Sequence, residues 1–352
     1  MPDNSLTDTV REFISTREGR DIDINTLRKE LRLDPDSKAW ENIHSIINRL
    51  VEEKRLKYSG KRDGVYKVIE QVEQVRVFVP GRERFLPFDL KFPQDHNRNV
   101  ELDFAENLII REGDLITIGG VKNKGKTTLC LNFCAENIDK HPVLMGNEYT
   151  VLISDTTEGN LIPAKPKYKP SPRFFNRLDT MKEWVNWIDE QGFDKFTLLP
   201  IREDYAERIV KDRINIIDWI NIDAGKLYDI GKVLEGIKAA LGRGIAIVAL
   251  QKGENFNNPR GGQFVRDFSD VEILLDGYGK NDDDILLTIK GVKEKREGYI
   301  SVIGKTYTYS IIDNGTKIIN FREVKHCPAC KGSGFKGSKE CELCLGRKFV
   351  DK

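Results

Sequence analysis

The sequence predicts an α/β fold in which helices cover both faces of a parallel sheet, with a small helical domain before it and a metal-binding module after it. Short, fully apolar runs alternate with helical patterns between residues 115 and 275, which is typical of strands buried on both faces. A glycine-rich loop joins the first run to a helical pattern, and four cysteines form two CxxC pairs near the end of the chain. We therefore divide the chain into residues 1–72, a linker over 73–100, the α/β core over 101–322 and the module over 323–352.

The composition is that of a globular protein. Hydrophobic residues make up 39% and charged residues 32% of the 352 residues, which excludes a mainly disordered chain. No apolar run approaches the roughly 18 residues of a membrane-spanning helix, and the first residues lack a signal-peptide profile, so we expect a cytoplasmic protein with no membrane partner. Lys and Arg number 57 against 56 Asp and Glu, so any nucleic-acid contact must come from local basic patches.

Residues 6–69 predict three helices followed by a β-hairpin. Apolar residues at helical spacing indicate one helix at the start of this range and a second near residues 25–31. A third begins after Asp36 or Ser37, either of which suits an N-cap. Two strands joined by a glycine-containing turn follow within residues 55–68.

Three helices and a hairpin in this order resemble the winged helix-turn-helix family. The resemblance implies that the third helix enters the DNA major groove and that the hairpin contacts the DNA backbone. Lys61 and Arg62, in the turn of the hairpin, are the candidate DNA contacts. Glutamates at positions 41, 52 and 53 dilute the basic charge, and many winged helices bind protein, so both kinds of partner remain open.

Three prolines and a glycine between residues 80 and 93 predict a linker, or an arm that packs on the next domain. The expected strands of the core then follow in turn. They lie at residues 115–118, 143–145, 196–199, 214–217, 245–250 and 271–275.

The first of these strands runs directly into a nucleotide-binding motif. Gly120-Val-Lys-Asn-Lys-Gly125-Lys126-Thr127 is a complete GxxxxGKT P-loop, followed by a good helix pattern. Glycines let backbone N–H groups wrap phosphates, and the helix N-terminus adds positive partial charge. Lys126 is expected to contact the β- and γ-phosphates of ATP, and Thr127 to bind Mg²⁺. The alternative is a chance motif in a Gly/Lys-rich turn, but such a motif would lack the strand before it and the helix after it. The predicted nucleotide-binding residues are Gly120, Val121, Lys122, Asn123, Lys124, Gly125, Lys126, Thr127 and Thr128.

Two acidic residues follow strands in the order that a P-loop ATPase uses. Asp218 ends an apolar strand and is the candidate Mg²⁺ ligand through water, in the manner of a Walker B aspartate. Glu148 follows the strand after the P-loop helix and is the candidate general base for water. Taken alone, either residue is better explained as a solvated turn residue, and it is their order after the P-loop that favours function.

These motifs in this order resemble the RecA/RadA/DnaB branch of P-loop ATPases. Asp218-Trp-Ile-Asn-Ile is similar to the DnaB-type Asp-Tyr-Leu-Gln-Leu, and the strand that follows ends in Gln251. In that branch the corresponding Glu is catalytic and the corresponding Gln senses the γ-phosphate. The resemblance thus implies that Glu148, Lys126 and Gln251 form the catalytic set.

The same resemblance extends to two basic segments. Residues 252–263 are similar to the second DNA-binding loop of RecA, which implies DNA contacts by Lys252 and Arg260. Residues 287–298 are similar to the strand that reaches the γ-phosphate of the neighbouring subunit. A solvated basic hairpin is the alternative there. The candidates for this trans finger are Lys293, Lys295 and Arg296.

Two features of the core stand outside this resemblance. Residues 150–194 do not align with the branch and are expected to be a family-specific insertion. Cys130 and Cys134 lie four residues apart on the P-loop helix, where a metal would need two further ligands, so we expect them in the core.

The C-terminal module carries Cys327-Pro-Ala-Cys330 and Cys341-Glu-Leu-Cys344, two CxxC pairs separated by ten residues. Four thiolates make a closed tetrahedral Zn²⁺ site that can fold a segment too short for a core of its own. Redox-active CxxC pairs are the alternative. The first pair and the residues after it resemble the DnaJ-type repeat CxxCxGxG, which implies a structural zinc.

Taken together, the resemblances imply a DNA-associated ATPase of RecA/DnaB type, with ATP, Mg²⁺ and Zn²⁺ as its ligands. It would act in DNA replication, recombination or mobile-element maintenance and hydrolyse ATP between subunits of a homo-oligomeric ring or filament. Single-stranded or duplex DNA and replication or recombination proteins would be its partners. The alternative is an ATP-switched regulator or scaffold that binds DNA or protein and whose turnover ignores DNA. A small-molecule kinase fits less well, because it needs neither the Gln251 strand nor the basic finger.

Overall fold

The computed structural model describes residues 5–60, 62–69, 87–146, 148–153, 167–220, 229–253 and 256–352. The chain forms two compact units, which divide between Arg84 and Phe85, inside the predicted linker. Within the described ranges, no helix has the length and apolar character needed to cross a bilayer.

The first unit packs three helices against a three-stranded antiparallel sheet with the strand order β1-β3-β2. Its core is apolar, with Val10, Leu27 and Ile43 fully buried, and the Ser37 hydroxyl caps the third helix as one of the two predicted N-caps. The three helices and the hairpin are those predicted, and β1 is an addition. The elements are α1 (Leu6–Ser15), β1 (Asp21–Asp23), α2 (Ile24–Glu30), α3 (Lys38–Glu52), β2 (Leu56–Tyr58) and β3 (Val65–Val68).

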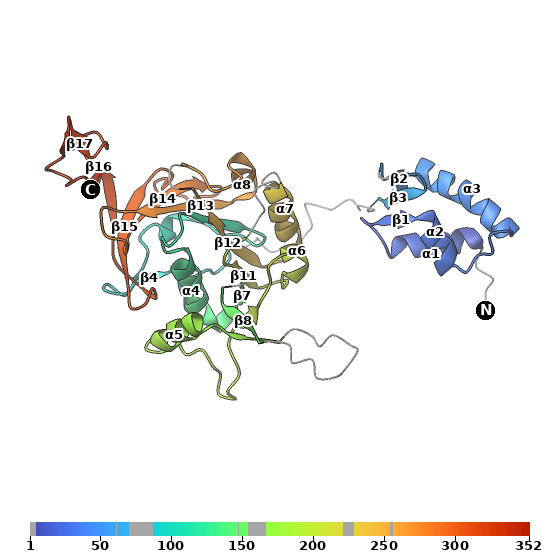
Figure 1. Ribbon diagram of the computed structural model, residues 1–352, viewed down its shortest axis with the longest axis horizontal. Coiled ribbons are helices and arrows are strands. Elements are labelled where there is room, and N and C mark those ends of the chain that lie inside the picture. The colour runs from blue at the N-terminus through green and yellow to red at the C-terminus, as the bar shows by residue number, and fades with distance from the viewer. Residues whose placement is uncertain are drawn as a thin grey trace. The chain divides into compact units, whose positions relative to one another are not determined.

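The second unit is a mixed α/β domain built on a ten-stranded sheet (Figure 1). Six strands, in the order β10-β7-β11-β12-β6-β13, are parallel, and these are the six predicted apolar runs. Four further strands extend the sheet by antiparallel pairing. The strands are β6 (Leu115–Gly120), β7 (Val143–Met145), β10 (Thr197–Leu199), β11 (Ile214–Ile217), β12 (Ile245–Gln251), β13 (Val271–Gly277), β14 (Asp284–Val292), β15 (Thr306–Ile312), β16 (Lys317–His326) and β19 (Phe349–Asp351).

Helices cover both faces of the parallel strands, as the apolar runs predict. Along β12, Ile245 and Ile247 face one layer of the core, whereas Ala246 and Val248 face the other. The first layer is completed by α4 (Lys126–Glu136) and α5 (Pro172–Met181). The second is completed by α6 (Tyr205–Arg208), α7 (Ile230–Ala240) and α8 (Gln263–Phe268). All residues of β6, β7 and β11 and most residues of β12 and β13 are buried, which explains the continuous apolar runs.

Short elements complete the unit. The cysteine-rich module is joined to the edge of the sheet, because β16 leads into it and β19 returns from it to pair with β16. The remaining elements are β4 (Gln94–Asp95), β5 (Val100–Glu101), η1 (Ala105–Asn107), η2 (Ile138–Lys140), β8 (Thr150–Ile153), β9 (Lys167–Pro170), β17 (Phe335–Lys336) and β18 (Lys339–Glu340).

A half-buried carboxyl group at the start of β6 gives a first prediction. Burial raises the pKa of Asp114 to about 6, although the Arg111 N–H donates to its carboxylate at 2.7 Å. The folded chain therefore binds more protons than the unfolded chain between about pH 4 and pH 6, and this contribution to stability is lost as the pH rises through that window. Asp114→Asn keeps a side-chain oxygen that can accept the hydrogen bond from the Arg111 N–H, but it removes the negative charge. At pH 8 it should stabilise the second unit by on the order of 1 kcal/mol after allowance for solvent screening.

The measurement is the melting temperature of both proteins between pH 4 and pH 8. The variant should melt a few degrees higher at pH 8, and the difference should shrink toward pH 4. A variant that melts lower than the wild type at pH 8 would show that the ionised carboxylate is stabilising.

Candidate functional site

The predicted P-loop lies between β6 and α4 and opens into a cavity of about 990 Å³. Gly125, the last residue before the helix, has a φ of +80°, and a side chain there would lie 2.7 Å from Ile311 Cδ1, so only glycine fits. The helix thus begins at Lys126 with its free N–H groups close to the cavity, an arrangement suited to anions. The cavity is lined by Lys122, Asn123, Lys124, Gly125, Lys126, Thr127, Thr128, Glu148, Arg173, Arg177, Trp219, Gln251, Arg260, Asp282, Asp283, Ile311, Ile312, Asp313, Asn314 and Gly315.

Lys126 lies folded over its own loop. Its Nζ donates hydrogen bonds to the carbonyl oxygens of Gly120 at 2.9 Å and Val121 at 2.8 Å. Burial lowers the pKa of Lys126, and Asp218 acts in the opposite direction. Phosphate oxygens are stronger acceptors for an ammonium group than amide carbonyls, so this side chain is placed to transfer to a phosphate at the loop.

Asp218 follows β11 and is fully buried. Its Oδ2 accepts a hydrogen bond of 2.7 Å from the Tyr149 hydroxyl. Its Oδ1 has no hydrogen-bond partner among the described residues. Burial raises the pKa of Asp218, and the side chains of Tyr149 and Thr127 act in the opposite direction. A buried carboxylate oxygen without a partner, next to a threonine hydroxyl, is the donor set that a hydrated Mg²⁺ uses. The residues present therefore fit this cation.

Glu148 and Gln251 complete the predicted catalytic set. Glu148 lies just beyond β7, is exposed, and accepts a hydrogen bond of 3.3 Å from the indole of Trp219. Gln251 is the last residue of β12 and lies beside Gly120 of β6. Both side chains line the cavity. The carboxyl ends of four parallel strands, β6, β7, β11 and β12, thus bring these residues to one edge of the sheet.

Sequence reasoning missed two arginines that line the same cavity. Arg173 and Arg177 lie on α5, within the stretch that does not align with the RecA-like branch. Arg177 Nε donates to the Asn314 carbonyl oxygen at 3.1 Å, and no carboxylate among the described residues pairs with it. Burial lowers the pKa of Arg177, which nevertheless stays charged at neutral pH. The sequence does carry a signal for them, because Ser171-Pro172 is a typical helix start and the two arginines after it are spaced four residues apart, on one face of that helix.

The turn between β15 and β16 also contacts the P-loop helix, which the sequence did not indicate. Thr128 Oγ1 donates to the Gly315 carbonyl oxygen at 2.9 Å, and Asn132 Nδ2 donates to that of Thr316 at 2.8 Å. The antiparallel half of the sheet thus returns to the cavity and forms part of its wall.

The predicted trans-finger residues lie away from the cavity of their own chain. They follow β14, whose last residue, Val292, pairs with Val271 at the edge of the sheet opposite the P-loop. Lys293 is held by Asp270 at 2.8 Å, whereas the backbones of Lys295 and Arg296 contact the η1 segment. Their action on a neighbouring subunit stays a prediction.

The predicted DNA contacts lie in both units, and the structure shows different surroundings for each of them. Lys252 is only 4% exposed and forms an ion pair with Asp276, so in this conformation its ammonium group is not free on the surface. Arg260 lines the cavity at the P-loop. In the first unit, Arg62 is exposed and paired with Asp23, and Lys61 lies outside the described residues.

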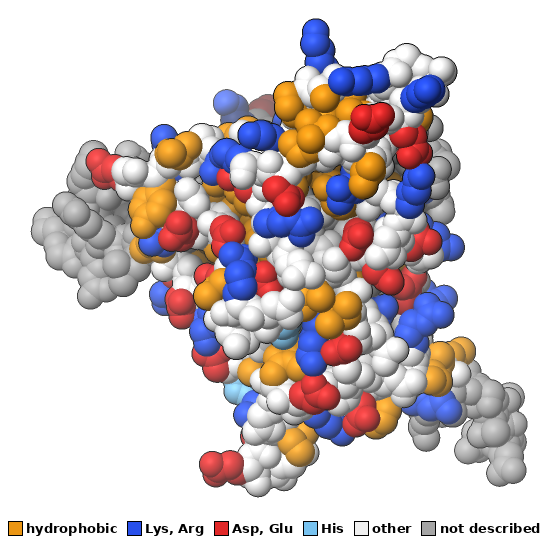
Figure 2. Space-filling view, turned by 90° about the vertical axis from the view of Figure 1, so that its left-hand side faces the viewer, with side chains coloured by type: hydrophobic (Ala, Val, Ile, Leu, Met, Phe, Trp, Pro, Cys, Tyr) orange, Lys and Arg blue, Asp and Glu red, His pale blue; other side chains and the backbone are white. Residues whose placement is uncertain are grey.

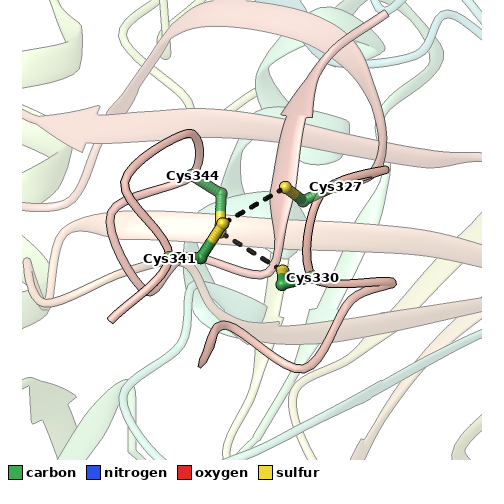
Figure 3. A group of neighbouring side chains, drawn as sticks. All are labelled: Cys327, Cys330, Cys341 and Cys344. Carbon is green, nitrogen blue, oxygen red and sulfur yellow. Dashed lines mark hydrogen bonds between the residues drawn. The ribbon is translucent and has the colours of Figure 1, made fainter. Parts of the chain in front are cut away.

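The four C-terminal cysteines converge on one point (Figure 3). All four sulfur atoms lie within 4.8 Å of one another, with Cys327 and Cys341 at 3.8 Å and Cys330 and Cys344 at 3.7 Å. Sulfurs at about 2.3 Å from a central zinc ion are about 3.8 Å apart in a regular tetrahedron. The thiols are free and buried, and the Gly334 N–H donates to Cys330 Sγ at 3.3 Å. The predicted cluster therefore forms, with a geometry that fits Zn²⁺.

The other cysteines and the adjacent histidine lie outside this cluster. Cys130 and Cys134 lie on α4 and are buried in the core, as predicted, and burial raises the pKa of both thiols. His326 stacks on Phe349 with 4.6 Å between ring centroids.

Neither a protein-family profile nor a curated protein matches this chain. Among solved structures, the crystal structure of the RadB recombinase resembles it with a TM-score of 0.40 and 16% sequence identity, over 60% of this chain and 92% of that chain. The chain's own fold is a mixed α/β architecture whose largely parallel central sheet carries a P-loop, in agreement with the core predicted from the sequence.

Proposed function

We propose that this protein is an ATP hydrolase of RecA/DnaB type that acts on DNA and hydrolyses ATP between the subunits of an oligomer. One observation carries the proposal. A single cavity contains the P-loop, the exposed carboxylate of Glu148 and the Gln251 side chain, and the buried Asp218 carboxylate lies beside the Thr127 of that loop. This combination supplies a phosphate cradle, a cation ligand and a base at one edge of the sheet.

The residues of this site have separate roles in the proposed hydrolysis. The α4 N-terminus, Lys126 and Arg177 offer positive charge to the phosphates. Glu148 accepts a proton from the attacking water, and Trp219 orients its carboxylate. Thr127 and Asp218 would hold Mg²⁺, which neutralises phosphate charge when it is bound. A basic residue after β14 of a neighbouring subunit would add further charge stabilisation.

The experiment is steady-state ATP hydrolysis by the whole chain without nucleic acid, with single-stranded DNA and with duplex DNA. Lys126→Ala provides the background rate. We expect DNA to raise the Lys126-dependent rate about tenfold or more, which corresponds to about 1.4 kcal/mol of coupling. Turnover that depends on Lys126 but ignores DNA would contradict the DNA-coupled motor and favour the ATP-switched regulator or scaffold. Sedimentation with and without ATP tests the oligomer in the same samples.

Arg177 gives a prediction that is independent of DNA. Arg177→Ala removes a positive charge that is held at the cavity by the Asn314 carbonyl, so we expect kcat/KM for ATP to fall by roughly 10- to 100-fold. Arg177→Lys should recover little, because one ammonium group cannot replace the fork of donors. Arg208→Ala, on the exposed part of α6, is the matched control. An Arg177→Ala enzyme with unchanged kcat/KM would remove this arginine from the mechanism.

A further inference from the structure

A second cavity, of about 670 Å³, lies between the α/β core and the cysteine-rich module, and we call it the module groove. The core contributes Lys124 of the P-loop and Phe256 of the loop after β12. The module contributes Phe335 of β17 and the basic pair Arg347 and Lys348, which follow the last cysteine. The groove therefore exists only where the module folds against the core.

The groove exposes large aromatic side chains on both of its walls. Phe256 is 69% exposed and Phe335 is 51% exposed. In the view of Figure 2, hydrophobic side chains lie among Lys and Arg side chains at the top of the molecule, the end where Figure 1 draws β17. Exposed rings on the walls of a basic groove are the usual platforms for unstacked bases.

The charge of the groove suits a polyanion. Five cationic side chains and two carboxylates line it, and a third carboxylate, Asp282, pairs with Lys124 from outside the groove. The balance is thus an excess of two positive charges. Arg347 and Lys348 have no carboxylate partner among the described residues, and Arg347 is fixed by a hydrogen bond of 3.1 Å from its Nε to the Cys344 carbonyl oxygen. The backbone of Cys344, one of the four predicted zinc ligands, thereby positions the Arg347 guanidinium at the groove.

We propose that the module groove binds single-stranded DNA, with Phe335 as a stacking platform and Arg347 and Lys348 as phosphate contacts. The inference rests on the DNA-dependent ATPase proposed above and assigns the cysteine-rich module a direct part in it. Single-stranded DNA fits better than duplex, because the bases of a duplex are already stacked on one another and cannot stack on the two rings.

The groove also touches the nucleotide site. Lys124 lines both cavities. Its side chain packs over Gly277, where an added Cβ would lie 3.2 Å from Lys124 Cε. Its Nζ donates to Asp282 at 2.8 Å, and Asp282 lines the nucleotide cavity. Occupation of the groove therefore acts on a residue of the P-loop. Binding of DNA and binding of nucleotide should be coupled, with the same factor in both directions.

The test is fluorescence anisotropy of a labelled oligo(dT) with the zinc-loaded whole chain at fixed salt. Phe335→Ala should weaken binding by about 5- to 100-fold, the loss expected for one base-stacking ring. Phe335→Trp should restore it. Phe193→Ala is the matched control, because Phe193 is 67% exposed and lies outside the groove. Zinc content and melting temperature show whether each variant is folded.

Three results would overturn the proposal. Oligo(dT) affinity that Phe335→Ala leaves within twofold would remove the groove as the site, while DNA-stimulated hydrolysis would still support the ATPase. Duplex of equal length that binds as tightly, with the same dependence on Phe335, would contradict single-strand recognition. A wild-type chain that binds neither DNA would overturn the groove together with the DNA part of the proposed function.

Discussion

With Gln in place of Glu148, the chain is expected to bind ATP as the wild type does and to hydrolyse it at least about a hundredfold more slowly. Gln keeps the volume of the side chain and an oxygen that can accept the hydrogen bond from Trp219. It cannot accept a proton from water at neutral pH. The loss should therefore appear in kcat, with the affinity for ATP changed by less than about threefold.

Single-turnover hydrolysis and equilibrium ATP binding separate these two effects. Glu203→Gln is the matched control, because Glu203 is exposed and lies outside the cavity. A Glu148→Gln enzyme with near wild-type kcat would show that another group activates the water. Loss of ATP affinity as well as turnover would indicate that Glu148 serves mainly to shape the cavity.

The second large effect is expected from removal of zinc. The four cysteines are buried mainly against one another, and Ala329 and Val350 are the only partly buried hydrophobic residues in the described part of the chain that pack on them. So small a core cannot hold the module folded, whereas a structural zinc contributes about 10–16 kcal/mol in comparable peptides. We expect about one zinc ion per chain in the wild type and almost none in Cys341→Ser.

Metal analysis and limited proteolysis test this expectation. Without zinc, the lysine-rich segment between the cysteine pairs should become the first site of tryptic cleavage, while the α/β core stays resistant. Cys134→Ala is the matched control, since this cysteine lies in the core and should leave the zinc content unchanged. A Cys341→Ser chain that retains stoichiometric zinc, or a module that resists trypsin without metal, would contradict the structural role.

The parts of the site that the sequence predicts are those encoded locally. The P-loop is contiguous, with its strand before it and its helix after it, so its residues can be named without any tertiary contact. Asp218 and Glu148 follow from the rule that parallel strands end at one edge of the sheet. The two CxxC pairs carry their own spacing, and the cluster they predict forms.

The parts that were missed depend on contacts between distant segments. Tyr149 reaches Asp218 across 69 positions of sequence, and no local pattern marks a tyrosine as a hydrogen-bond donor to a buried carboxylate. Arg177 is held at the cavity by its hydrogen bond to the Asn314 carbonyl oxygen, in the turn between β15 and β16. Lys252 looks like an exposed loop cation in the sequence, yet the fold buries it against Asp276.

The same distinction explains the fold. The six parallel strands are continuous apolar runs and could be predicted, whereas β1 has three residues, two of them aspartates, and carries no strand pattern. In β15, polar and aromatic residues alternate, and only pairing with β14 and β16 establishes its place in the sheet. The extent of the antiparallel half thus depends on tertiary pairing.

The central claim, that the cavity at the P-loop is an ATP site, is tested most directly by equilibrium binding of a fluorescent ATP analogue to the whole chain, with and without Mg²⁺. We predict saturable binding that Mg²⁺ strengthens and that Lys126→Ala weakens by about tenfold or more. Lys232→Ala, an exposed lysine of α7, should bind as the wild type does. Absence of binding, or binding that Lys126→Ala leaves unchanged, would contradict the account.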